Sequence, residues 1–410
     1  MIDRYKNEVI DDYWCDNRKY SIWYRIQQAI AESNAEYTGE DLSEWKLINF
    51  DESDIAEIKR IEQDTKHDVA AFIKFICEEN PKNARFIHSS LTSSDLVDTF
   101  NSFAIKRSFE YVISCVETLN NSLNEMSYKY LNVKMLGRTH GQHASITTLG
   151  HKLEVYCRQF EHWIDHARMV CSNVKFKLDG PVGMGCNMTE YNSWILSSEL
   201  DMERFNGSTQ VIPRYYYYPV MSDILALSMI LTSIATDLRL LNQTEIGEFV
   251  IENTENQWGS SSMPHKINPI SLEQVCGLSR LIKGYFNAFI ENMVLWNERD
   301  ISNSSVERIV FPDIFHIIVT QIGSMKRSLY TGHFDVVRIK ENLMNARIDV
   351  ISNQLVQIML SDNNIAYDQA VERVKSLLSK YKGMLIKDIF PNGVSDSCDI
   401  EALKELGIIK

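Results

Sequence analysis

The sequence predicts an all-α fold built around a central bundle of long helices. Apolar residues recur at alternating spacings of four and three along three segments, the pattern of helices that pack along their whole length. These seams run from Ile105 to Met126, from Leu149 to Val170 and from Leu227 to Leu241. No proline occurs between Pro81 and Pro181, and no segment shows a convincing parallel-sheet pattern. Long helices are therefore expected to set the architecture.

Three helical domains are expected, because 410 residues exceed the size of one typical domain. Residues 1–92 mix short amphipathic pieces with polar breaks and predict an N-terminal helical domain. Residues 93–338 hold the long helices and form the central bundle domain. Residues 339–410 predict a smaller C-terminal helical domain. Either Ser94 or Asp95 is suited to cap the first long helix.

Two further long helices are expected, from about Ser271 to Trp296 and from about Asp313 to Tyr330. A helix of about 25–30 residues is a rod of about 40 Å. About five such rods from one chain cannot cover all of their apolar surface, so the pattern predicts self-association. The long helices carry no Glu-x-x-His pair, which argues against a metal site of the ferritin type.

The composition argues against several classes of function. A formal net charge of −13 disfavours nucleic-acid binding, which needs a basic excess, but it is compatible with an anionic small molecule. The eight cysteines show no C-x-x-C spacing, which argues against zinc and against a disulfide framework. No run reaches the roughly 18 apolar residues that span a bilayer, and the N-terminus is too polar for a signal peptide. We therefore expect a cytoplasmic protein without a membrane segment.

The loop at residues 259–269, with the sequence GSSSMPHKINP, stands apart from the helical seams. Three consecutive hydroxyls bury little surface and compete for backbone hydrogen bonds, so they favour neither a helix nor a strand. A long loop with hydroxyls, a lysine and an asparagine amide between helices is more typical of a functional loop than of a connector. From these residues alone, a serine-rich surface turn is an equally good interpretation.

The complete string resembles the signature loop of the fumarase/aspartase superfamily, G-S-S-x-M-P-x-K-x-N-P, and it matches every specified position. The resemblance implies that Ser260 is the catalytic base and that Lys266 takes part in catalysis. It also implies that Ser261 and Asn268 bind the substrate. A serine hydroxyl is too weakly acidic to act as a base unaided, so backbone N–H groups and nearby cations must stabilise its alkoxide.

A polar insert at residues 137–143 interrupts the helical pattern between two long helices. A lone histidine in such a place is more often structural than catalytic. However, the string R-T-H-G-Q resembles the segment that carries the general acid in the adenylosuccinate lyase branch of the superfamily. This resemblance places the acid at His140 rather than at His143.

A histidine beside an aspartate precedes an apolar helix at residues 65–72. Asp68 can orient the imidazole of His67 and raise its basicity, or it can cap the helix while the histidine faces solvent. The string H-D-V resembles a segment that lines the active site in the same branch. The resemblance implies that His67 assists His140 and that Lys66 and Asp68 contact the substrate.

Other strings resemble substrate-binding segments of the same branch. The turn at residues 88–95 resembles its T-S-x-D loop, which binds a carboxylate or hydroxyl group of the substrate. The string at residues 295–308 resembles its phosphate and nucleotide region, and arginines with serines suit phosphate because both donate to its oxygens. The residues assigned to the substrate in this way are Arg4, Tyr5, His88, Thr92, Ser93, Gln210, Arg214, Arg299, Ser304 and Arg308.

Some residues depart from the branch. Asn297 and Asn303 stand where bacterial members commonly have histidines, and Ile146 stands in place of an expected proline. Tyr215–Tyr218 replaces a more polar stretch. These departures affect the expected nucleotide pocket more than the elimination chemistry.

The resemblance implies a lyase that cleaves a C–N bond by trans β-elimination and releases fumarate. The implied substrate is a succinylated purine nucleotide: adenylosuccinate, which gives AMP, and the succinylated aminoimidazole carboxamide ribotide, which gives its carboxamide, in purine biosynthesis. The resemblance also implies a homotetramer with shared active sites and no metal or organic cofactor. Two alternatives stay open: another lyase of the superfamily (argininosuccinate, aspartate or cycloisomerising type) and a non-catalytic helical scaffold.

Overall fold

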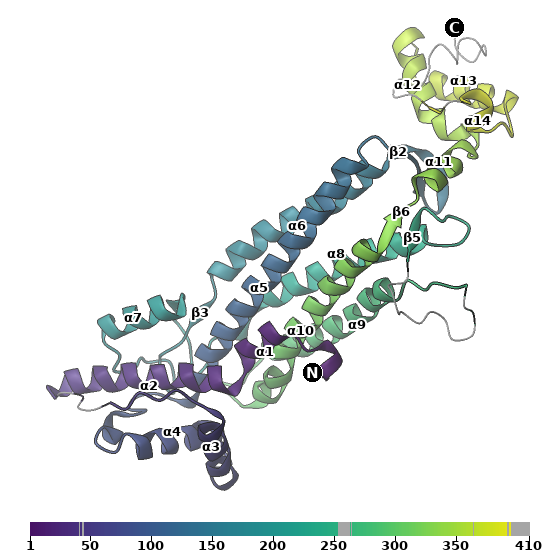
Figure 1. The fold of residues 1–410 in the computed structure, drawn as a ribbon. Helices are drawn as coiled ribbons and strands as arrows, with labels where there is room; N and C mark the ends of the chain where they lie inside the picture. The colour runs from purple at the N-terminus through teal and green to yellow at the C-terminus, as the bar shows by residue number, and fades with distance from the viewer. Residues whose placement is uncertain are drawn as a thin grey trace. The chain divides into compact units, whose positions relative to one another are not determined.

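The computed structural model describes residues 1–40, 42, 45–252, 263, 265–363, 365–391 and 393–394. The chain forms two compact units. The first comprises residues 1–117, 162–232 and 274–323, and the second comprises residues 118–161, 233–273 and 324–410. Helices dominate the described part of each unit, so the predicted all-α fold is confirmed (Figure 1).

Long helices follow the predicted seams. Their bounds are α5 (Ser93–Lys129), α6 (Leu149–Ser172), α8 (Tyr218–Leu241), α9 (Ile270–Glu291) and α10 (Ser302–Thr331). The three seams lie on α5, α6 and α8, and their apolar side chains are buried, as at Phe109, Leu153 and Leu231. The alternating spacing therefore marks the faces of these helices that pack inside the chain.

Helix α10 begins earlier than the sequence predicts. It starts at Ser302 rather than near Asp313, and it holds Pro312 in its interior. A proline removes one backbone donor and disfavours a helix at the preceding residue. Here that residue, Phe311, is fully buried, and its packing offsets the cost. Residues 302–308, which carry two of the expected phosphate contacts, therefore form the first turns of a helix.

The first unit begins with shorter helices around an aromatic core. Their bounds are α1 (Glu8–Trp14), α2 (Asp16–Thr38), α3 (Glu52–Thr65) and α4 (Asp68–Glu79), with the 3-10 turns η1 (Asp3–Tyr5) and η2 (Ala84–Phe86) before and after them. Tyr20 of α2 stacks on Phe72 of α4, with ring centroids 5.6 Å apart. Helix α3 starts with a capping box at Asp51 and ends at the left-handed Lys66, which makes His67 the N-cap of α4.

Short strands join the helices. In the second unit, β1 (Lys134–Thr139) and β2 (Gln142–Thr148) form an antiparallel hairpin between α5 and α6, and β5 (Phe249–Ile251) pairs antiparallel with β6 (Gly332–Phe334). In the first unit, β3 (Lys175–Phe176) runs parallel to β4 (Glu203–Arg204), with α7 (Glu190–Leu200) between them in the chain. The sequence did not predict these pairs, because strands this short and irregularly buried show no clear period of two.

The C-terminal part of the second unit is a small helical cluster. Its elements are α11 (Val336–Met344), η4 (Ile348–Ile351), α12 (Ser352–Asn363), α13 (Tyr367–Lys380) and α14 (Ile386–Ile389). Buried Leu343, Ile348 and Leu355 form a core with Leu136 of β1, so the base of the hairpin packs on this cluster. Each compact unit is made of three separate segments of the chain, and the boundaries between the units fall within long helices. The division into three domains after residues 92 and 338 stays a prediction.

Helix α8 and the turn before it, η3 (Arg214–Tyr217), form a strongly apolar segment. Residues Arg214–Leu241 are long and apolar enough to cross a membrane by length and composition, a test that the core helices of soluble proteins also pass. In the described chain, 44% of the most apolar window of this segment is buried. Tyr215, Tyr216, Tyr218 and Leu240 are its exposed large hydrophobic residues in the described chain.

Candidate active site

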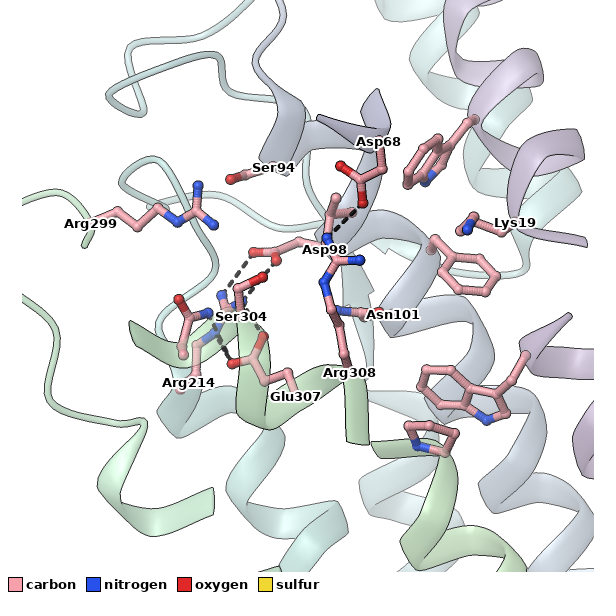
Figure 2. A pocket seen from close by; sticks show the side chains of 16 residues that line it. Lys19, Asp68, Ser94, Asp98, Asn101, Arg214, Arg299, Ser304, Glu307 and Arg308 are labelled. Carbon is pink, nitrogen blue, oxygen red and sulfur yellow. Dashed lines mark hydrogen bonds and ion pairs between the residues drawn. The ribbon is translucent and has the colours of Figure 1, made fainter. Parts of the chain in front are cut away.

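A cavity of about 280 Å³ in the first unit is lined by side chains from α1, α2, α4, α5, η3, α10 and the segment before α10. Its polar lining combines cations, acids and hydroxyl or amide groups: Lys19, Asp68, Ser94, Asp98, Asn101, Arg214, Arg299, Asn303, Ser304, Glu307 and Arg308 (Figure 2). The aromatic rings of Trp14, Trp23 and Phe100 also line it. The cavity therefore brings together Arg299, Ser304 and Arg308, which are among the residues that the resemblance assigns to the phosphate.

Arg214 lies in the wall of this cavity and is only 2% exposed. Its guanidinium forms two-pronged ion pairs with Asp98 of α5 and Glu307 of α10, with N to O distances of 2.7 to 2.9 Å (Figure 2). Burial opposes the charge, but the two carboxylates raise the pKa of Arg214 well above its ordinary value. Arg214 thus ties α10 to α5, and its expected contact with the substrate stays a prediction.

Asn303 of α10 is buried beside this ion-pair network. Its Nδ2 donates to Glu307 Oε1 over 3.0 Å, and the same oxygen accepts from Arg214 Nε over 2.7 Å. Asn303 Oδ1 and Arg299 Nε, both buried, have no hydrogen-bond partner among the described residues. The cavity lining thus contains one residue with an unpaired acceptor and one with an unpaired donor.

Arg308 joins α10 to the start of α4. Its guanidinium donates to Asp68 Oδ2 over 2.6 Å (Figure 2). Although burial opposes ionisation, the Arg308 guanidinium holds the pKa of Asp68 below its usual value. The half-exposed His67 ring accepts from the Ala70 N–H at Nδ1 over 3.3 Å. Asp68 is therefore paired with Arg308, and the cap of α4 orients the His67 ring in this arrangement.

A buried ion pair stabilises the turn that carries Thr92 and Ser93. The Thr92 N–H donates to Asp95 Oδ2 over 2.8 Å, and Lys177 Nζ pairs with Asp95 Oδ1 at 2.5 Å. The backbone N–H groups of Asp179–Gly180 also donate to Asp95. Asp95 and Lys177 are completely buried, whereas Thr92 and Ser93 are partly exposed. Their hydroxyls are therefore placed on a rigid support.

The other expected contacts of the first unit are scattered around this core. Gln210 accepts at Oε1 from Arg299 over 3.1 Å. Burial lowers the pKa of His88 to about 4, with a raising effect from Asp95 and a smaller lowering effect from His67. The remaining expected contacts, Arg4 and Tyr5 in η1 and the exposed Lys66, do not line the cavity.

His140 lies in the second unit, at the tip of the β1–β2 hairpin. It has a φ of 52° and precedes Gly141 with a φ of 71°, so both residues of the tight turn have positive φ as hairpin turns require. At the hairpin, Arg138 makes a two-pronged ion pair with the buried Glu248, at 2.8 and 2.9 Å. His140 itself is exposed, whereas burial followed by the Arg138 charge lowers the pKa of His143.

The signature loop is described only in part. Ser260 and Ser261, the expected base and its neighbour, lie outside the described residues. Lys266 is exposed, and its N–H donates to the Met263 carbonyl over 3.0 Å. Asn268 is partly exposed and precedes α9. The structure therefore assigns Lys266, Asn268 and His140 to the second unit and the cavity to the first.

Sequence reasoning missed several groups of the cavity. Asp98 and Glu307 hold Arg214, and Lys19 lines the cavity while it pairs with Asp16 at 2.6 Å. No local string marks these residues, because their partners lie far away in the chain.

Comparison with known proteins agrees with the fold. The sequence model of a family described as lyase matches residues 2–284. The fumarate lyase from Mesorhizobium sp. BNC1 superposes with a TM-score of 0.79 over 100% of this chain and 93% of that chain, at 16% identity. The β-carboxy-cis,cis-muconate cycloisomerase from Acinetobacter calcoaceticus superposes with a TM-score of 0.74 over 97% and 91%, at 15% identity. Fold and family model together define an enzyme of the lyase class.

Curated relatives narrow this class. The adenylosuccinate lyase of Staphylococcus saprophyticus is 31% identical over 383 residues, which cover 92% of this chain and 87% of the relative. The adenylosuccinate lyases of Thermotoga maritima and Aquifex aeolicus are 31% and 30% identical over 386 residues each, covering 92% and 93% of this chain and 87% and 88% of the relatives. The chain belongs to the adenylosuccinate lyase family.

Proposed function

We propose that this enzyme cleaves adenylosuccinate to AMP and fumarate, and the succinylated aminoimidazole carboxamide ribotide to its carboxamide and fumarate, in the cytoplasm. The observation that carries the substrate class is the cavity of the first unit. It combines Arg299, Ser304 and Arg308 with aromatic rings, which suits an anionic nucleotide. The family of the chain supports the same assignment.

The phosphate group is proposed to bind at the first turns of α10. Arg299 and Arg308 supply planar guanidinium groups, and Ser304 supplies a hydroxyl near the helix N-terminus at Ser302. Arg308 is paired with Asp68 but its side chain is 61% exposed, so it can turn toward a phosphate at small cost. Arg4 and Tyr5 are proposed to complete the nucleotide contacts.

The succinyl part of the substrate is proposed to bind at the support built on Asp95 and Lys177. The hydroxyls of Thr92 and Ser93 would donate to one carboxylate. Gln210 is proposed to donate to the substrate next to this carboxylate. Lys66, Asp68 and His88 are proposed as further contacts, the last as a neutral donor. Ser261 of the signature loop belongs to the same set of proposed contacts.

Elimination needs a base at the carbon next to a carboxylate and an acid at the leaving nitrogen. We assign the base to Ser260 and the acid to His140, with His67 tuning that acid. Lys266 and Asn268 would hold the carboxylate on which negative charge develops, and they are most useful when the loop closes and excludes water. The C–N bond then breaks as the proton on carbon leaves to Ser260 and the nitrogen takes a proton from His140. These steps require no metal or organic cofactor.

A homotetramer with shared active sites is proposed for the assembly. The apolar segment Arg214–Leu241 supports it, because 44% of its most apolar window is buried in the described chain and a second copy would cover the rest. In the proposed assembly each active site draws residues 65–72, 137–142 and 259–269 from different subunits.

The test is an ultraviolet assay of fumarate release from adenylosuccinate, with argininosuccinate and aspartate as parallel substrates. We expect turnover of adenylosuccinate alone. Turnover of argininosuccinate or aspartate instead would move the chain to another lyase activity of the superfamily. No turnover of any of the three by a folded tetramer would favour a non-catalytic scaffold.

A further inference from the structure

The chain before α5 follows an uncommon path. His88 and Ser90 have φ values of 57° and 64°, in the left-handed region that residues other than glycine rarely adopt. The Leu91 N–H donates to the His88 carbonyl over 3.3 Å, which closes a tight turn directly before Thr92. A conformation of this kind persists only where surrounding groups hold it in place.

The group that holds it is Gln27 of α2. The Gln27 side chain is completely buried, and it contacts His88 twice. Its Oε1 accepts from the His88 backbone N–H over 2.7 Å, and its Nε2 lies 3.0 Å from the ring Nδ1 of the same residue. One amide therefore fixes both the backbone and the ring of His88.

These two contacts determine where the imidazole carries its proton. A backbone N–H can only donate, so the Gln27 oxygen must face it and the Gln27 NH2 group must face the ring. An NH2 group can only donate, so the His88 Nδ1 must accept and carries no proton. A neutral imidazole that accepts at Nδ1 carries its proton on Nε2. Among the described residues, this Nε2 has no hydrogen-bond partner of its own.

We propose that Gln27 is a positioning residue that fixes His88 as the neutral tautomer with its proton on Nε2, and so makes it a hydrogen-bond donor for the substrate. This inference rests on the proposed function for the role of His88, because only a bound substrate uses the donor. It does not depend on that function for the tautomer, which follows from the contacts within the free protein.

The charged groups around His88 support the same state. Asp95 favours an imidazolium, but this carboxylate is already paired with Lys177 at 2.5 Å. Burial and the neighbouring His67 both disfavour the charge, and the pKa of His88 falls to about 4. The neutral donor is therefore available at pH values well above 4.

The direct test uses magnetic resonance of the intact protein labelled with ¹³C at histidine Cδ2, whose chemical shift separates the two neutral tautomers from the imidazolium. The His88 signal is assigned by its loss in His88→Gln. We expect the Nε2–H tautomer in the wild type at every pH from about 5.5 to 8.5. In Gln27→Glu the new carboxylate attracts a proton to Nδ1, and the pKa of His88 should rise by about two units or more. The matched control is Gln28→Glu, whose side chain donates instead to Glu32 over 2.8 Å and should leave the His88 signal unchanged.

Kinetics separate positioning from a purely structural role. The KM of Gln27→Glu for adenylosuccinate should stay close to the wild-type value at pH 6, where the imidazolium still donates from Nε2. The KM of this variant should rise about tenfold by pH 8.5, because loss of the proton leaves Nε2 as an acceptor. Its kcat should change much less. Gln27→Met removes the clamp without adding charge, and its KM should be raised equally at all pH values. A merely structural role would lower kcat in both variants without recovery at low pH.

A wild-type His88 signal of the Nδ1–H tautomer or of the imidazolium would overturn the inference, whatever the variants do. An unchanged KM profile in Gln27→Glu with a shifted tautomer would show that the substrate does not use this donor, and would overturn the positioning role. The expected tautomer in a protein that turns over no adenylosuccinate would refute the proposed function alone.

Discussion

The cavity of the first unit and the hairpin tip of the second differ in how firmly their polar groups are held. In the cavity, Arg214 is clamped by two buried carboxylates, and the Thr92 turn rests on the buried pair of Asp95 and Lys177. At the hairpin tip, the exposed His140 lies in a tight turn, and the ion pair of Arg138 with Glu248 lies next to that turn. The support of Thr92 and Ser93, two residues proposed to bind the substrate, is thus preorganised within the first unit, whereas His140, the proposed acid, is exposed.

This difference predicts which property each kind of substitution should affect. A rigid, buried support for binding groups lowers the cost of ordering them when the substrate arrives. In the proposed assembly, an exposed group such as His140 acquires its working geometry when a loop or another subunit closes over it. Changes at the tip or in the signature loop should therefore affect turnover, and changes in the buried network should affect folding and binding.

The largest effect is expected for Ser260→Ala. Loss of the proposed base should lower kcat by at least ~10³-fold, the scale of an essential proton-transfer group, while the melting temperature stays the same. Steady-state kinetics and a thermal melt of the same preparation measure both. Near-normal turnover would remove Ser260 from the mechanism and make Ser261 the next candidate.

His140→Ala and His143→Ala form a matched pair on the same hairpin. His140→Ala should lower kcat by at least ~10²-fold, because the leaving nitrogen loses its acid. His143→Ala should cost much less. Equal losses of kcat in the two variants would mean that His140 is not distinguished from His143 as the acid.

Mixed tetramers sharpen the same comparison. Inactive Ser260→Ala and inactive His140→Ala chains, reassembled together after partial unfolding, should recover part of the wild-type activity if each site takes these groups from different subunits. Absence of activity in verified mixed tetramers would place both groups in one subunit.

The buried network predicts an effect on stability. Arg214→Met leaves Asp98 and Glu307 as unpaired buried carboxylates, and removing one partner of a buried ion pair costs about 3–5 kcal/mol. Arg158→Met, on an exposed part of α6 with a side chain 70% exposed, should change stability by less than about 0.5 kcal/mol. Urea unfolding of both variants at one protein concentration is the measurement. Equal stabilities would show that the network contributes nothing to the fold.

The smallest effect concerns the pair of Asp68 and Arg308. Because the folded protein holds the pKa of Asp68 below its ordinary value, the stabilisation from this pair is present above that ordinary value and is lost as the pH falls through the folded one. Asp68→Asn should thus be less stable than the wild type by up to about 1 kcal/mol at pH 7, with the gap closing below about pH 4. A gap that stays constant down to pH 3 would contradict the ion pair.

The contrast also shows what the sequence was able to predict. The seams on α5, α6 and α8 could be predicted because each repeats a local spacing. The string at 295–308 could be recognised because its residues are adjacent in the chain, and its role in phosphate binding stays a prediction. The clamp on Arg214 was not readable, because Asp98 and Glu307 lie 116 and 93 residues away from it. The early start of α10 was missed because Pro312 suggests a boundary that burial of Phe311 overrides.

Calorimetry of AMP binding tests most directly whether binding and proton transfer rest on separate groups. A charge-assisted contact to phosphate is worth roughly 1.5–3 kcal/mol, so Arg308→Ala should weaken AMP binding by about one to two decades. Ser260→Ala should bind AMP as tightly as the wild type does. If the wild-type protein fails to bind AMP at millimolar concentration, or if Ser260→Ala loses as much affinity as Arg308→Ala, the proposed separation of the nucleotide-binding cavity from the proton-transfer groups is contradicted.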